Sequence, residues 1–211
     1  MPTASSLFEK LSLWISTSQE VDGLWVGTVE DSPYPGLRRV EQALELIKRT
    51  GRIQYARITR HLRRIWVNIV PAYDACYRHA LNACVFDERF VVSKETTVER
   101  IAEVIIHEAT HARLEDRGIS YDEKLRHRIE AICLGRELAF ARRLSDDTQS
   151  KELERTIDRC AVDQPYFSDK NFYERHYQGS IDALHFLGTP DWLVRVIVKL
   201  RPRKHSPDWQ K

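Results

Sequence analysis

Residues 104–113 read VIIHEATHAR and place two histidines and a glutamate inside an apolar segment. Apolar residues occur on nearly every side of the helix that this segment predicts, and such a helix is buried in the core of a fold. Imidazole and carboxylate groups are costly to bury unless something binds them. The fold must therefore form around this helix and supply a partner for His107, Glu108 and His111.

The spacing of these three residues predicts a metal site. His107 and His111 share one helix face with Cβ atoms about 5–6 Å apart, so both rings can bind one ion at about 2.0–2.1 Å, as zinc requires. Glu108 lies about 100° around the helix, which suits a general base acting on metal-activated water. The motif arises by chance roughly 0.02 times in a chain of this composition. The alternative is a pair of core histidines satisfied by hydrogen bonds.

A catalytic zinc usually has three protein ligands and one open position. An extension of the motif with a third histidine would require glycine and histidine where this chain has Leu114 and Arg117. Glu130 follows His111 by 19 residues and is the polar member of an apolar helix face. The other members of that face are Cys133, Leu134, Leu138 and Ala141. Glu130 is therefore the candidate third ligand.

Other assignments remain open for the expected helix over 121–144, which contains Glu130. Glu137 and His127 are rival ligands, and Glu137 could instead orient a histidine from behind. Glu130 could also form a buried salt bridge with Arg113 or Arg126, because buried charges without a metal are usually paired.

The motif His107 to His111, followed by Glu130 within IEAICLG, resembles the gluzincin branch of the zinc metallopeptidases. The resemblance covers residues 84 to about 145. Ala131 matches the small residue that often follows the glutamate, whereas Arg113 departs from the usual hydrophobic residue. The resemblance implies a zincin-like minimal core, in which a short antiparallel sheet packs on the motif helix and an edge strand holds an extended peptide. CVFDERFVV at 84–92 stands where that strand is expected.

The same resemblance implies a site and a mechanism. Zn²⁺ would be bound by His107, His111 and Glu130, and Glu108 would act as the general base. A further donor outside the motif would stabilise the oxyanion. The candidates for this donor are Tyr121, Tyr173, His176 and Tyr177.

Periodicity and breakers predict a predominantly helical α+β fold. Helices are expected over 8–15, 37–50, 52–64, 97–116, 121–144, 148–162, 169–187 and 190–200, and strands over 23–30, 65–70 and 84–92. The fourth and fifth of these helices begin with capping boxes, at Thr96–Glu99 and Ser120–Glu123. We expect a single domain over 1–211, with 1–35 and 202–211 peripheral or loosely ordered.

The segment 48–64 is strongly basic, and no acidic residue occurs from Leu46 to Tyr73. Its basic residues are Lys48, Arg49, Arg52, Arg57, Arg60, Arg63 and Arg64. Such a segment can meet nucleic acid, anionic lipid or an acidic protein. The formal net charge of only +2 favours a face balanced by acids such as Glu41, Glu45 or those of 146–158.

Several sequence features bear on the compartment of the cell in which the protein is expected. No apolar stretch reaches the ~20 residues that span a bilayer, the start lacks the basic region of a secretory signal, and the four cysteines form no C-x-x-C pair. The sequence therefore predicts a cytoplasmic zinc metallopeptidase-like hydrolase acting on a peptide or protein. The alternatives are a non-catalytic zinc-binding protein of the same fold, or a basic nucleic-acid or protein interaction module whose histidines belong to the core.

Overall fold

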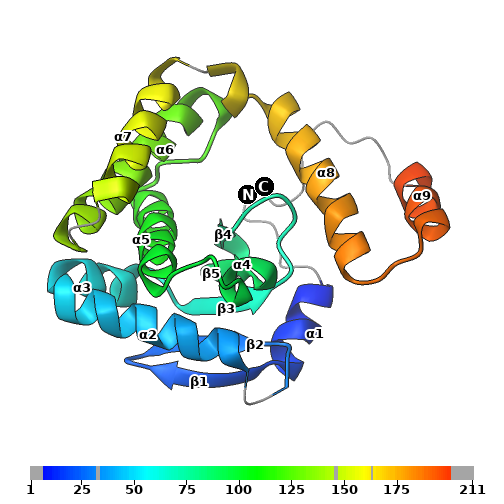
Figure 1. Cartoon of the computed structure of the whole chain (residues 1–211), viewed down its shortest axis with the longest axis horizontal. Helices are drawn as coiled ribbons and strands as arrows, with labels where there is room; N and C mark the ends of the chain where they lie inside the picture. Colours follow the sequence, from blue (N-terminus) through cyan, green and yellow to red (C-terminus); the bar gives the residue numbers. More distant parts are fainter. Residues whose placement is uncertain (1–6, 32–33, 145–146, 163, 201–211) are drawn as a thin grey trace.

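The computed structural model describes residues 7–31, 34–144, 147–162 and 164–200. Within these ranges the fold is α+β and predominantly helical, as expected (Figure 1). The strands are β1 (Thr17–Val21), β2 (Leu24–Thr28), β3 (Arg64–Asn68), β4 (Ala75–Arg78) and β5 (Ala83–Asp87). The α-helices are α1 (Leu7–Ile15), α2 (Pro35–Thr50), α3 (Arg52–His61), α4 (Glu88–Val92), α5 (Val98–Glu115), α6 (Glu123–Ala141), α7 (Asp147–Val162), α8 (Asp169–Phe186) and α9 (Asp191–Leu200). The expected tail at 202–211 lies outside the described residues.

The strands form one sheet in the order β1-β2-β3-β5-β4. The two outer pairs are antiparallel, but β2 pairs with β3 and β3 with β5 in parallel. The expectation of an antiparallel sheet is therefore wrong for its centre. The reason is that α2 and α3 form a crossover between β2 and β3, which returns the chain to the same end of the sheet.

The N-terminal region contributes two strands to the sheet: β1 is an exposed edge strand, whereas β2 is largely buried. Asp22 and Gly23 have φ of 51° and 82°, which fits the two-residue turn favoured in hairpins and joins β1 to β2. Leu24 and Val26 of β2 are 1% and 0% exposed. Their burial anchors this segment in the main core.

The segment 84–92 is not a single strand. The strand β5 ends at Asp87, whose carboxylate accepts a hydrogen bond from the backbone N–H of Arg89 at 2.8 Å and so caps α4. The other carboxylate oxygen of Asp87 accepts from the N–H of Val70 at 2.9 Å. Because β4 covers the outer side of β5, the edge of the sheet is β4 and not the segment predicted from sequence.

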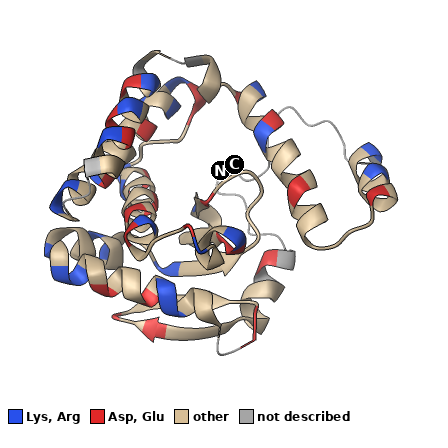
Figure 2. Cartoon of the chain, in the orientation of Figure 1, with Lys and Arg blue, Asp and Glu red and all other residues tan. Residues whose placement is uncertain are grey.

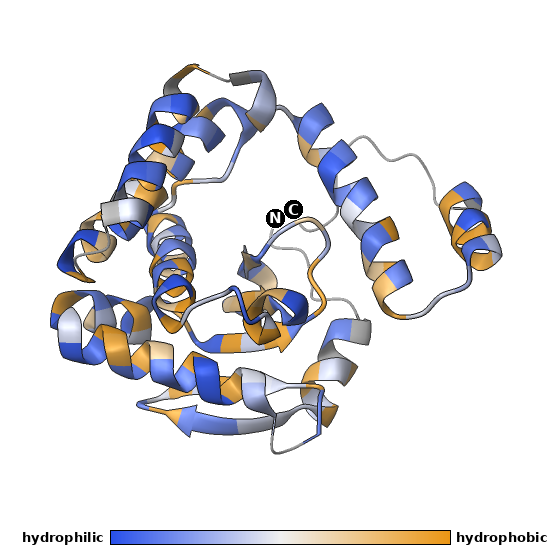
Figure 3. Cartoon of the chain, in the orientation of Figure 1, coloured by the Kyte–Doolittle hydropathy of each residue, from blue (hydrophilic) through white to orange (hydrophobic). Residues whose placement is uncertain are grey.

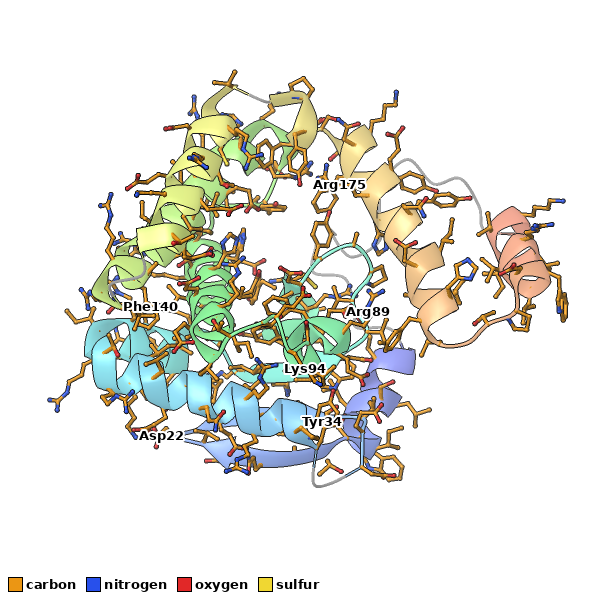
Figure 4. All side chains as sticks on the ribbon, viewed as in Figure 1. Asp22, Tyr34, Arg89, Lys94, Phe140 and Arg175 are labelled. Atoms are coloured by element: carbon orange, nitrogen blue, oxygen red, sulfur yellow. The ribbon has the colours of Figure 1, made fainter. Side chains whose placement is uncertain are left out.

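The core lies between the sheet and three helices. One sheet face contributes Leu24, Val26, Ile65, Val67, Cys84 and Phe86, and it packs with buried residues of α2, α3 and α5. In Figure 3, apolar and polar segments alternate along α2, and its buried residues include Leu37, Val40, Leu44 and Ile47, which repeat at helical spacing. Phe140, labelled in Figure 4, joins the end of α6 to this core. The opposite face forms a second cluster around Trp66 and Val85, against Leu13 of α1.

The two helices of the candidate site begin slightly later than expected. The N-cap of α5 is Thr97, whose hydroxyl accepts from the N–H of Arg100 at 3.1 Å, one residue beyond the predicted cap. The predicted box at 120–123 does not form at the start of α6, where the N-cap is Asp122. Glu123 instead accepts a hydrogen bond from the N–H of Asp169 at 2.8 Å, at the start of α8.

Helix α8 returns the chain to the loop between β3 and β4. Gly179 faces Ala72 so closely that a Cβ at 179 would overlap the backbone of Ala72. Ala72 has φ +73°, a conformation that costs energy for a residue with a side chain. Tyr73 and Phe172 continue the contact, with ring centroids 5.5 Å apart. Among the helices of the described residues, none has the length and apolar composition that crossing a bilayer requires.

Candidate metal centre

Helices α5 and α6 pack side by side and bring three predicted ligands together. The Nε2 atoms of His107 and His111 lie 3.2 Å apart. Glu130 places Oε2 at 3.2 Å from Nε2 of His107 and Oε1 at 3.5 Å from Nε2 of His111. The three side chains thus point at one another from two helices, as the apolar stripe on α6 predicted.

This triangle has the size that a tetrahedral zinc site needs. With ligand bonds of about 2.0–2.1 Å, two ligand atoms of a tetrahedral site are separated by about 3.4 Å. The observed separations of 3.2, 3.2 and 3.5 Å match that value. Two imidazoles and one carboxylate are also a donor set that zinc accepts. The residues present therefore fit the ion, and Glu130 is the carboxylate with both oxygens in reach.

A carboxylate stands behind the first histidine. Oε2 of Glu137 lies 3.0 Å from Nδ1 of His107, and Glu137 is 1% exposed. Because a carboxylate only accepts, Nδ1 carries a hydrogen, and Nε2 is the ring nitrogen that faces the triangle. Arg100 donates to the other oxygen of Glu137 and lies 3.3 Å from Glu103. Arg100, Glu137 and His107 form a chain of hydrogen bonds ending at the candidate ligand.

Tyr121, one of the predicted oxyanion donors, has a different contact. Its hydroxyl donates to Oε1 of Glu130, and its ring lies edge-on to His111 at 5.2 Å between centroids. The guanidinium of Arg126 lies 5.3 Å from the centre of the same ring. Tyr121 therefore holds the carboxylate and one imidazole in place.

Glu108 is buried at the side of the triangle, 6% exposed. Its carboxylate accepts a hydrogen bond from the backbone N–H of Tyr77 on the edge strand β4. Burial raises the pKa of Glu108 to about 7, and the nearby Glu130 adds to the effect. A carboxylate with a pKa near neutrality can both take and return a proton.

The charges of the metal-free triangle are unevenly distributed. Burial alone would lower the pKa of His107, but hydrogen bonds to Glu130 and Glu137 raise it well above its ordinary value. Burial lowers the pKa of His111 to about 4. The pKa of Glu130 falls to about 2, because the two histidines outweigh the burial that would raise it. Glu130 therefore stays ionised beside neutral His111, and its negative charge is paired with the positive charge of His107.

Cys133 also lies near the two histidines, although the sequence predicts it only as part of an apolar stripe. Its Sγ and one ring nitrogen each of His107 and His111 all lie within 4.8 Å of one another. Cys133 is one turn beyond Glu130 on α6, and that spacing is the signal that could have identified it. Burial raises the pKa of its thiol well above the ordinary value, and the carboxylates nearby add to the effect.

The other predicted oxyanion donors belong to a different helix. His176, Tyr173 and Tyr177 lie on α8, where the two tyrosine rings stack on each other at 6.5 Å between centroids. Neither alternative salt bridge of Glu130 forms in the described part of the chain. There, Arg126 pairs with Asp169 at 2.7 Å, and Arg113 has no acidic partner within 4.0 Å. Across the same ranges, no hydrogen bond or ion pair joins His127 to the triangle.

Helix α8 supplies an aromatic and a basic side chain, Phe172 and Arg175, next to Tyr121 and Tyr166. Arg175 points from α8 toward the centre of the molecule (Figure 4), where its guanidinium lies 4.0 Å from the ring centre of Tyr166 and 5.5 Å from that of Phe172. The ring of Phe172 also lies 6.4 Å from that of Tyr121. Phe172 thus links α8 to the residue that holds Glu130.

Comparison of the chain with protein-family models, with curated proteins and with solved structures found no match.

Proposed function

We propose that this protein is a zinc-dependent hydrolase of peptide bonds, with a gluzincin-like centre. The observation that carries the proposal is the triangle of His107, His111 and Glu130, whose donor atoms are 3.2–3.5 Å apart. Glu108, the candidate base, lies beside that triangle on the same helix.

Each residue has a role in this reaction. Bound zinc would polarise the scissile carbonyl and lower the pKa of the attacking water. Glu108 accepts the proton of that water and returns it to the leaving amine. Glu137 fixes the tautomer of His107, and Tyr121 restrains Glu130. These two contacts hold the ligands in a geometry that needs little rearrangement on metal binding.

The position of β4 supports an extended peptide as the substrate. This strand is the last in the sheet order, so its outer edge has no strand beside it in the described residues. The N–H of Tyr77 in β4 already contacts Glu108. A peptide pairing with this edge would therefore pass close to the base.

The test replaces Glu108, the candidate base, and keeps the three candidate ligands. Glu108→Gln should retain about one zinc per chain by mass spectrometry and lose at least about 100-fold in hydrolysis of a mixed peptide library. Glu99→Gln, an exposed change on the same helix, is the matched control and should keep both properties. A wild-type protein that binds no zinc, or that binds zinc and cleaves nothing while Glu108→Gln behaves identically, would refute the proposal.

Cys133 supports a second candidate, a zinc protein without turnover. If its sulfur became a fourth ligand, the site would have no open position for water. Cobalt substitution separates the two, because a cobalt–thiolate bond gives an intense near-ultraviolet absorption that a site of histidine and carboxylate lacks. The hydrolase predicts no such band, and it predicts that Cys133→Ser keeps its zinc.

A further inference from the structure

Arg175 of α8 is a half-buried arginine without an acidic partner in the described part of the chain. Its Nη1 donates to the backbone oxygen of Tyr166 at 2.9 Å. Its Nε is buried and has no hydrogen-bond partner among the described residues. Across the same ranges, no carboxylate oxygen lies within 4.0 Å of the guanidinium. The positive charge of Arg175 is therefore available to an anion from outside the chain.

Two aromatic rings hold this guanidinium in place. Its Cζ lies 4.0 Å from the ring centre of Tyr166 and 5.5 Å from that of Phe172. A planar group stacked in this way loses little further freedom when it binds a ligand. The anion that suits it best is a carboxylate, because a guanidinium donates two parallel hydrogen bonds to the two oxygens.

Arg126 shows how an arginine with a structural role is satisfied in the same surroundings. Its Cζ also lies against Phe172, 4.8 Å from the ring centre, but Arg126 is 1% exposed and pairs with Asp169 at 2.7 Å. It donates to the backbone oxygen of Phe167 as well. Helix α8 carries both acidic and basic residues (Figure 2), so its charge alone does not single out Arg175. What distinguishes Arg175 is that no such pairing occurs within the described residues.

A short series of ring contacts links Arg175 to the metal centre. The ring of Phe172 lies 6.4 Å from that of Tyr121, and the ring of Tyr121 lies 5.2 Å from that of His111. Together with the 5.5 Å between Arg175 and Phe172, these steps place the guanidinium within about five residues of extended chain from His111. A peptide whose scissile bond lies at the zinc can therefore reach Arg175 with a group only a few residues away.

Tyr73 connects Arg175 with the edge strand β4. It lies just before Ala75, the first residue of β4, and its ring is 5.5 Å from that of Phe172. Burial raises the pKa of Tyr73 to about 12; the nearby charge of Arg175 opposes that rise, and the charge of Glu130 adds to it. The segment that leads into β4 thus lies beside both Arg175 and a candidate metal ligand.

The direction of β4 indicates which part of a bound peptide meets Arg175. Antiparallel pairing is more stable per residue than parallel pairing and more frequent. A peptide added in that way to the outer edge of β4 runs from Arg78 towards Ala75. Its C-terminal part then passes Tyr73 and approaches Arg175. The group that meets the guanidinium therefore follows the scissile bond in the peptide sequence.

We infer that Arg175 binds a carboxylate of the substrate on the C-terminal side of the cleaved bond and so determines specificity. This inference rests on the proposed function, because it takes the peptide to lie along β4 with its scissile bond at the zinc. The carboxylate belongs either to the C-terminus of the peptide or to an Asp or Glu side chain. Arg175 selects the substrate and takes no part in the proton transfers of Glu108.

The test measures peptide binding separately from cleavage. Glu108→Gln protein with added zinc is titrated into fluorescent pools of random peptides of about eight residues, long enough to reach Arg175. Each pool is made with a free C-terminal carboxylate and with a C-terminal amide. The free-carboxylate pool should bind about 10- to 100-fold more tightly, which is the scale of hydrogen bonds to a charged group.

Two further variants are made on the same Glu108→Gln background. Arg175→Gln should bring the affinities of the two pools to within about twofold, because the charged donor is lost. Lys170→Gln is the matched control: it removes an exposed positive charge from the same helix and should keep the preference.

Two additions cover the source of the carboxylate and the folding of the variant. Amidated pools with and without Asp and Glu are compared, and an Arg175-dependent preference for the acidic pool assigns the carboxylate to a side chain. Arg175→Lys keeps the charge but loses the planar fork, so it should lower the preference by at least about threefold. It takes the place of Arg175→Gln if circular dichroism shows that the latter does not fold.

The outcomes separate this inference from the proposed function. The inference is overturned if no pool with a carboxylate is preferred, or if the preference survives the loss of Arg175. Cleavage of the same pools by the protein with Glu108 intact is measured independently. Cleavage without a carboxylate preference refutes the role of Arg175 and keeps the hydrolase. An Arg175-dependent preference in binding, without any cleavage, refutes the hydrolase and keeps Arg175 as a carboxylate-binding residue.

Discussion

Glu137 lies behind His107, with 3.0 Å between its Oε2 and Nδ1 of the ring. The two residues come from α6 and α5, and Arg100 donates to the far oxygen of the same carboxylate. This contact keeps a hydrogen on Nδ1, so that Nε2 is the nitrogen available to an ion. Removing the charge of Glu137 should therefore weaken metal binding.

Glu137→Gln should weaken zinc binding by about 10- to 100-fold, because the contact behind a metal-bound histidine contributes on that scale. The amide oxygen can still accept from Nδ1, but it no longer balances Arg100. Competition with a chromogenic chelator measures the affinity. Glu99→Gln serves again as the control, and equal affinities for the two variants would contradict this role of Glu137.

Zinc should stabilise the wild-type protein and should not stabilise Glu130→Gln. A ligand that binds only the folded state at about 1,000 times its Kd adds about 4 kcal/mol to the free energy of unfolding. Thermal unfolding with added zinc or with a chelator measures the shift in Tm. An equal shift in the variant would mean that Glu130 is not a ligand.

The Tyr121→Phe variant tests whether Tyr121 holds Glu130 in place or acts as the oxyanion donor predicted from sequence. The hydroxyl donates to Glu130, so its loss should weaken zinc binding by about tenfold, as expected for a hydrogen bond to a charged group. With zinc saturating, kcat should change only a few-fold. A fall in kcat of about 100-fold or more at full zinc occupancy would restore Tyr121 as the oxyanion donor.

Gly179→Ala should destabilise the protein by about 1–3 kcal/mol, because the new methyl group overlaps the backbone of Ala72. Gly135→Ala is the control, because position 135 lies inside α6 and a methyl group there would enter open space. That change should stabilise by about 0.5–1 kcal/mol, as alanine does in helices. Urea denaturation measures both, and a neutral Gly179→Ala would show that α8 is free to move away from the loop.

Much of the helical framework follows from local sequence signals. The apolar spacing of α2 and the long pattern of α5 predict those helices to within a few residues, since a buried helix face must repeat at 3.6 residues. Glu130 could be found because it interrupts an apolar stripe. These features depend only on residues close together in the chain.

Features set by distant contacts were missed. β4 has only four residues, ACYR, and is a strand because β5 pairs with it. Glu123 resembles part of a capping box but binds the start of α8 instead. Asp87 ends β5 early because one carboxylate can bind both Val70 and Arg89. None of these partners can be identified without knowing the tertiary structure.

The parallel pairing of β2 with β3 also affects how the chain reaches its native state. Strand β2 is synthesised before α2 and α3, and its partner follows only after both. Pairings between distant segments form slowly, and an unpaired strand can associate with other chains while it waits. The rate-limiting step of folding should therefore be the pairing of the N-terminal hairpin with β3. Rapid expression to a high protein concentration should favour aggregation through that hairpin.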